Sequence, residues 1–111
     1  MAKTAAGWTK QAVLNRLYDA GIYPDEERIT KHRDGSFSFR KYGFYFTEAE
    51  QIEMMNSVKA AFGGWSGYDA NGYITRVGSE VKGATRATQG MACLVTYVYL
   101  ADSLVPVQPT E

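Results

Sequence analysis

Few side chains in this chain are of the types that carry out chemistry. Among its 111 residues there is one histidine, His32, and one cysteine, Cys93. A structural zinc site needs several His or Cys ligands, so these two residues cannot supply one. We find no glycine-rich phosphate-binding loop and no nucleophile placed beside a base. The sequence therefore predicts a protein that is not an enzyme and has no cofactor or metal.

The basic side chains gather in one segment. Residues 29–46 hold four basic residues (Lys31, Arg33, Arg40 and Lys41) against Asp34, which gives a formal charge of +3. Residues 47–62 hold three glutamates against one lysine, which gives −2, and the whole chain is neutral. A protein that binds nucleic acid independently of its base sequence usually has an excess of basic residues. The neutral charge of this chain therefore counts against that class of protein. The four basic residues remain the candidate nucleic-acid site of an alternative hypothesis.

Capping residues predict two helices. Thr9 is a good N-cap, and Gly21 suits the left-handed position that ends a helix. Thr47 and Glu50 have the spacing of a capping box, and Gly63-Gly64 stops the helix that follows.

Turn residues predict two hairpins. Ile29–Arg33 and Ser36–Arg40 flank Asp34-Gly35, which is a strong hairpin signal when both turn residues adopt positive φ. We expect the chain to bend near Lys41–Gly43, with a third short strand at Phe44–Phe46. A second hairpin is expected over Tyr73–Lys82, with Gly78-Ser79 as its turn.

The last segment allows two interpretations. We expect a long helix from Ala84 to about Leu104, because apolar residues recur in it at helical spacing. That helix would be apolar on a second side as well, so it is either central in the fold or covered by a partner. The run Leu94–Leu100 is rich in residues that favour strands, so a strand remains the alternative there.

These elements predict the fold class α+β. The expected order is helix, hairpin with a third strand, helix, hairpin, helix (α-ββ(β)-α-ββ-α), with a small antiparallel sheet packed against three helices. The length fits one domain over residues 1–111, with flexible tails at 1–7 and 106–111. A single cysteine allows no internal disulfide, and Met1–Trp8 has no apolar signal region, so we expect a cytoplasmic protein. The longest apolar run is too short to span a membrane.

Residues 29–62 also carry a resemblance. A hairpin turning at Asp34-Gly35, with basic residues on its strands and a capped helix after it, resembles the arm-type DNA-binding domain of tyrosine integrases. The resemblance implies a sheet that contacts DNA, and it supports the alternative hypothesis of a nucleic-acid accessory protein.

The main hypothesis is a protein-binding module. Tyr and Trp are enriched in protein interfaces, and this chain is rich in both. The candidate contact residues lie in the glycine-rich loop and in the last predicted helix: Trp65, Tyr68, Tyr73, Tyr99 and Leu100. The expected partner is another protein, and a homodimer through the last helix is the second interpretation. Size and neutrality fit inhibitors or adaptors from phage or mobile elements, such as anti-CRISPR proteins, that act on a host protein.

Overall fold

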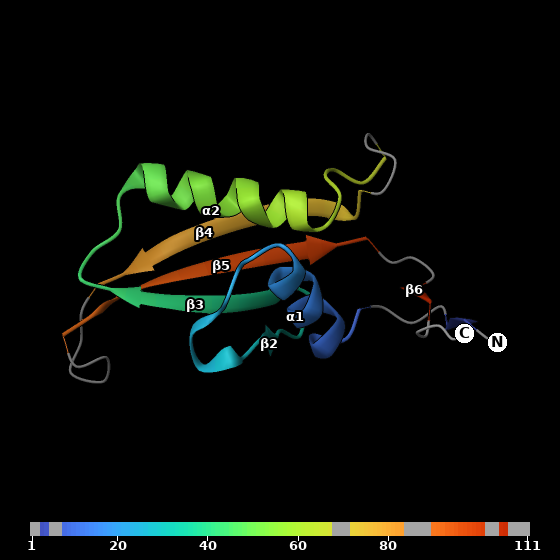
Figure 1. Ribbon diagram of the computed structural model, residues 1–111, viewed down its shortest axis with the longest axis horizontal. Helices are drawn as coiled ribbons and strands as arrows, with labels where there is room; N and C mark the ends of the chain where they lie inside the picture. Colours follow the sequence, from blue (N-terminus) through green and yellow to red (C-terminus); the bar gives the residue numbers. More distant parts are fainter. Residues whose placement is uncertain (1–2, 5–7, 68–71, 84–89, 102–104, 107–111) are drawn as a thin grey trace.

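The computed structural model describes residues 3–4, 8–67, 72–83, 90–101 and 105–106. Two α-helices pack on one face of a four-stranded antiparallel sheet whose strand order is β2-β3-β5-β4 (Figure 1). The helices are α1 (Lys10–Asp19) and α2 (Glu48–Ala61), and a short 3-10 turn, η1, spans Asp25–Glu27. The strands of this sheet are β2 (Thr30–Lys31), β3 (Phe37–Gly43), β4 (Ile74–Lys82) and β5 (Ala92–Leu100). Outside it, β1 (Lys3–Thr4) pairs with β6 (Val105–Pro106).

The connection from β3 to β4 runs through α2 and places this helix in a layer on one face of the sheet. Both strands pair antiparallel with β5, so they run parallel to each other with β5 between them. Helix α2 joins them and packs against β4 and β5, which makes a split β-α-β unit. Helix α1 packs beside α2 on the same face. Neither of these helices covers the opposite face of the sheet.

Both predicted caps are confirmed. The Thr9 hydroxyl accepts a hydrogen bond from the Ala12 amide, and Thr47 and Glu50 form the reciprocal capping box. Helix α1 ends in a Schellman motif, because the Ile22 amide donates to the Leu17 carbonyl at 2.8 Å and Gly21 has φ of +82°.

The predicted hairpin at Asp34-Gly35 is also confirmed, although its turn is longer than expected. The His32 amide donates to the Ser36 carbonyl, which leaves three residues in the loop, and of these only Gly35 has positive φ. This is a type I turn followed by a glycine in the left-handed region. The Asp34 carboxylate accepts hydrogen bonds from the Ser36 amide and hydroxyl, and these bonds lower the pKa of Asp34.

The prediction of three helices is wrong. Ala92–Leu100, placed in the last helix, is the strand β5, at the centre of the sheet between β3 and β4. The helices cover one face of β5, and on the other face the side chains of β3 and β4 shield Cys93 and Val95. Consecutive residues of β5 can therefore be apolar, which explains why its sequence looked like a helix with two apolar sides. The rest of the predicted helix, residues 84–89 and 102–104, lies outside the described residues.

Three smaller expectations about strands are wrong as well. Gly78-Ser79 is not a turn but lies in the middle of β4. A bulge at the start of β4, between Ile74 and Arg76, lets Ile74 and Val77 both face the helices. Strand β3 continues through Lys41–Gly43 without the expected bend. Phe44–Phe46 forms no strand, because the chain leaves the sheet there and the Phe46 ring folds back over Gly43.

The core lies between the helices and the sheet. Trp8, Val13 and Leu17 reach it from α1 and the residues before it, and Val58 and Phe62 reach it from α2. The sheet contributes the following buried residues: Phe37, Phe39, Ile74 and Val98. Neither described helix is long and apolar enough to cross a membrane.

One buried hydroxyl in this layer predicts a stabilising substitution. Thr96 of β5 is 0 % exposed, and its Oγ1 has no hydrogen-bond partner. Removing an unsatisfied buried polar group avoids a desolvation penalty, so Thr96→Val should raise the free energy of unfolding by about 1 kcal/mol. Urea unfolding measures this. Thr96→Ser is the matched control, since it keeps the hydroxyl and loses a methyl group, and it should destabilise. Equal destabilisation by both would show that the hydroxyl is satisfied.

Candidate functional site

The aromatic residues predicted to bind a protein do not share one surface. Trp65 is partly exposed, with the Lys59 ammonium 5.3 Å from its ring centre. Tyr73 packs edge-on against Trp8 in the core, with ring centres 5.1 Å apart. Leu100 packs against the core, whereas its neighbour Tyr99 lies on the opposite, helix-free face. Tyr68 lies outside the described residues.

The four basic residues of the alternative hypothesis are also spread apart. Side chains alternate along a strand, so Arg40 and Lys41 lie on opposite faces of β3. Lys31 lies on the helix side, with its ammonium 5.6 Å from the centre of the Phe37 ring, and Arg33 is exposed in the hairpin turn. The predicted basic hairpin is therefore not one continuous basic surface.

Exposed apolar side chains gather instead at the end of the sheet where β3 ends and β5 begins (left in Figure 1). Phe44 is 91 % exposed and Tyr45 is 73 % exposed, directly after β3. Gly43 pairs with Ala92, so Met91 lies beside them at the same end. We call this surface the apolar end, and its exposed members are Phe44, Tyr45, Ile52, Val81 and Met91.

A groove of about 370 Å³ adjoins the apolar end, between α2 and the segment after α1. Its apolar lining includes Ile22, Phe46, Met54 and Leu94, and Tyr23 stands at its rim with 61 % of its surface exposed. This volume falls within the range of sites that accept a small molecule or a large side chain.

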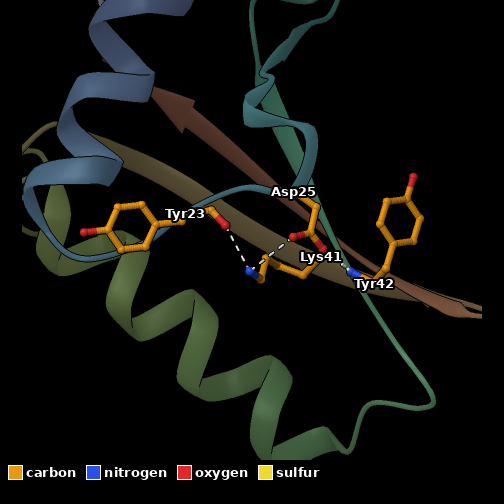
Figure 2. Close-up of polar contacts among 4 residues, drawn as sticks. All are labelled: Tyr23, Asp25, Lys41 and Tyr42. Carbon is orange, nitrogen blue, oxygen red and sulfur yellow. Dashed lines mark hydrogen bonds and ion pairs between the residues drawn. The ribbon is translucent and has the colours of Figure 1, made fainter.

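Hydrogen bonds fix one wall of the groove (Figure 2). The Lys41 ammonium donates to the Tyr23 carbonyl at 2.9 Å and pairs with the Asp25 carboxylate at 3.6 Å. The other Asp25 oxygen accepts a hydrogen bond from the Tyr42 amide at 2.7 Å. These contacts tie residues 23–25 to β3, so the wall is held to the sheet by both backbone and side chain.

The groove and the apolar end lie beside an acidic stretch of α2. Glu48, Glu50 and Glu53 occupy its first half, and Glu50 and Glu53 line the groove. Lys41 is the basic residue of the groove, and its charge is already balanced by Asp25. The surface around the groove is therefore apolar and negatively charged.

The helix-free face of the sheet has a different character. By the strand register, its β3 and β5 positions are Ser38, Arg40, Tyr42, Cys93, Val95, Tyr97 and Tyr99, and its β4 positions are Arg76, Gly78, Glu80 and Lys82. Cys93 and Val95 are each only 3 % exposed although neither α1 nor α2 lies over them. Their cross-strand neighbours are long polar side chains, Arg40 and Glu80 beside Val95, and these shield the apolar atoms.

Polar contacts order this open face. The Tyr97 hydroxyl donates to Glu80 Oε2 at 2.8 Å, and this bond raises the pKa of Tyr97. Lys82 pairs with the same carboxylate at 3.8 Å. The Arg76 guanidinium lies 5.1 Å from the centre of the Tyr99 ring, within cation–π range. A side-chain hydrogen bond with Tyr42 raises the pKa of Arg40.

One contact on this face resembles part of a catalytic dyad. His32 Nε2 lies 2.8 Å from Ser38 Oγ. However, Ser38 is buried near the start of β3, where the strand pairs with β2 on one side and β5 on the other. Acyl transfer also needs backbone N–H groups free to bind an oxyanion, and a paired central strand does not offer them. The geometry fits a structural hydrogen bond.

The described residues offer little for metal or thiol chemistry. No three His, Cys, Asp or Glu side chains in that part of the chain come close enough together to hold a metal ion. Burial raises the pKa of the Cys93 thiol, so the reactive thiolate is disfavoured.

Comparison with known proteins gives no identification. No family model matches the chain, and no curated protein and no solved structure is similar to it. Its function must therefore be argued from the two surfaces described above.

The two surfaces were missed from the sequence for different reasons. Phe44 and Tyr45 look like strand residues, and the open face combines residues from β3, β4 and β5 that are far apart in sequence. One available signal was the run Phe44–Phe46, because three aromatics immediately before a helix cap cannot all fold into the core.

Proposed function

We propose that this domain is a non-enzymatic protein-binding module whose contact surface is the apolar end together with its groove. The observation that carries the proposal is the gathering of exposed Phe44, Tyr45 and Met91 beside a preformed groove. Folded monomers rarely expose contiguous apolar side chains unless a partner covers them. Phe, Tyr and Met are also among the residues enriched in protein interfaces.

The chemistry of the surface indicates the kind of partner. The groove has room for one large apolar side chain, and Glu50 and Glu53 at its edge favour positive charge beside that side chain. The partner we propose therefore presents an apolar residue flanked by Lys or Arg. Because Lys41 and Asp25 already hold the groove wall in place, little ordering free energy is lost on binding.

The test removes the two most exposed aromatic residues. Proteins captured from cells by the wild-type domain are identified, purified and titrated calorimetrically against the wild type and the double variant Phe44→Ser, Tyr45→Ser. Loss of two hot-spot residues should weaken the Kd by about 30-fold or more. The melting temperature of the variant should stay close to that of the wild type, since neither side chain belongs to the core.

A second variant separates this surface from the one predicted by the sequence. Trp65→Ala changes the loop at the other end of the sheet and should leave the Kd unchanged. If Trp65→Ala abolishes binding and the double variant does not, the apolar end is not the contact surface. A mass that rises with protein concentration in the wild type, and not in the double variant, would instead assign the apolar end to self-association.

Some finer expectations from the sequence remain predictions. Nothing in the fold bears on an origin in a phage or mobile element, on inhibition of a host protein or on a cytoplasmic location. The homodimer was predicted through the second side of the last helix, and that segment is the central strand β5.

A further inference from the structure

We propose that the open face of the sheet binds single-stranded nucleic acid, with bases stacking on Tyr97 and Tyr99 and phosphates contacting Arg40, Arg76 and Lys82. This site lies on the opposite face of the sheet from the helices and the groove. The proposal is independent of the protein-binding function proposed above.

Charge is the first argument. The open face carries Arg40, Arg76 and Lys82 against Glu80, with Glu26 of η1 near Arg40 at its edge. Helix α2 carries Glu48, Glu50 and Glu53 against Lys59. The zero net charge of the chain therefore conceals a basic sheet face and an acidic helix face. Phosphate binding depends on the local cluster of cations, so neutrality of the whole chain does not exclude it.

The tyrosines are the second argument. Tyr97 and Tyr99 are two residues apart on one strand, so they lie on the same face about 7 Å apart. Glu80 holds Tyr97 through its hydroxyl, and the Arg76 guanidinium lies over Tyr99. Aromatic rings and guanidinium planes on an open sheet are platforms on which unpaired bases stack.

Gly78 is the third argument. It lies opposite Tyr97 in the centre of β4, and a Cβ added there would meet no atom within 4 Å. Glycine weakens a strand interior, and where no bulge explains it, it often marks a place where another molecule approaches the backbone closely. The bulge of β4 lies elsewhere, between Ile74 and Arg76. In the proposed complex a base lies over Gly78, between Arg76 and Glu80 and beside Tyr97.

The exposed apolar residues argue against a protein on this face. Cys93 and Val95 are already shielded, and the exposed large apolar side chains of the described residues lie at the apolar end, on the helix side or in loops. A duplex is disfavoured as well, because its base faces are stacked internally and cannot reach the tyrosines.

The experiment measures fluorescence anisotropy of labelled oligo(dT) and oligo(U) of about 12 nucleotides, with a hairpin duplex as comparison. Binding should be strongest at about 50 mM salt and should fall with a slope of log K against log[salt] of about −2, as expected for three phosphate contacts on a single strand. The two oligomers differ in the 2′-OH and in the C5-methyl group of the base, so equal affinity means that the site distinguishes neither. Tighter binding of one oligomer assigns the natural ligand as DNA or as RNA.

Variants locate the site. Tyr97→Ala and Tyr99→Ala should each weaken binding about 10-fold, and Arg76→Ala should make the salt slope shallower by about 0.7. Lys10→Ala is the matched control, because it removes the same charge from the helix side, and it should leave the slope unchanged. Gly78→Val should abolish most binding while the melting temperature holds or rises, because it fills the open space and favours a strand.

Several results would overturn the proposal. The wild type could fail to bind at low salt, or it could bind the duplex more tightly than the single strands. Arg76→Ala and Lys10→Ala could also change the slope of log K against log[salt] equally. If Gly78→Val lowers the melting temperature, its loss of binding is not informative, and Gly78→Ser and Tyr99→Ala are measured in its place. Unchanged affinity for the oligomers in both of these variants would also overturn the proposal. The double variant at Phe44 and Tyr45 should bind nucleic acid normally. Loss of nucleic-acid binding in that variant would place the site on the apolar end, against this proposal.

Discussion

Phe62→Ala is expected to lower the free energy of unfolding by about 3–5 kcal/mol. Phe62 is 0 % exposed at the end of α2 and meets Trp8 edge-on, with ring centres 5.4 Å apart. Its removal would open a cavity where both helices meet the sheet. A domain of this size is usually stable by about 5–15 kcal/mol, so the variant should lose a large part of its stability.

Phe44→Ala is the matched control, because it removes the same atoms from a side chain that is 91 % exposed. It should change the free energy of unfolding by less than about 0.5 kcal/mol. Urea unfolding followed by tryptophan fluorescence compares the two, since Trp8 contacts Phe62 and reports on the core. Similar losses in both variants would mean that Phe62 is not the centre of the core.

Gly72→Ala is expected to lower the free energy of unfolding by about 2 kcal/mol or more. A Cβ at Gly72 would overlap the Trp65 carbonyl oxygen, and it would lie 2.6 Å from the carbonyl carbon of Trp65 and 2.9 Å from that of Gly64. These atoms belong to the backbone, so no change of rotamer relieves the overlap. Hydrogen bonds hold the segments together, because the Tyr73 amide donates to Phe62 and the Ile74 amide donates to Gly64.

Gly78→Ala provides the comparison for that prediction. The same methyl group at Gly78 meets open space in β4, so stability should hold or rise slightly. The measurement is the urea midpoint of each variant, together with hydrogen exchange at the Ile74 amide, which should become faster only in Gly72→Ala. Equal midpoints for the two variants would contradict the close approach of Gly72 to Trp65.

Local signals in the sequence predicted the first half of the fold well. Thr9, Gly21, Thr47 and Glu50 act through hydrogen bonds to residues within one or two turns, so their roles can be read from spacing alone. The turn after β2 was likewise predicted from neighbouring residues, Asp34-Gly35. Its three-residue length, however, depends on how β2 and β3 pair. The same reasoning found the start and end of both helices.

The second half of the fold depended on contacts between distant residues. Val95 and Val98 fit an apolar helix as well as a buried strand, and β3 and β4 decide between them by pairing with β5 from both sides. Gly78-Ser79 is typical of a turn, but pairing with Tyr97 and Thr96 keeps it extended. Periodicity failed in β5 because Cys93 and Val95 are buried on the open face as well, so apolar and polar residues do not alternate along the strand.

The candidate sites follow the same division. The sequence by itself determined the two capped helices, the hairpin at Asp34-Gly35, the neutral charge and the scarcity of His and Cys, because these depend on neighbouring residues or on composition. Only the tertiary structure decided which side chains share a face. It separated Arg40 from Lys41 and Tyr99 from Leu100, since alternation places neighbours on opposite sides of the sheet. It also brought Arg76, Tyr97 and Arg40 onto one face, because strand pairing joins residues that are far apart in the chain.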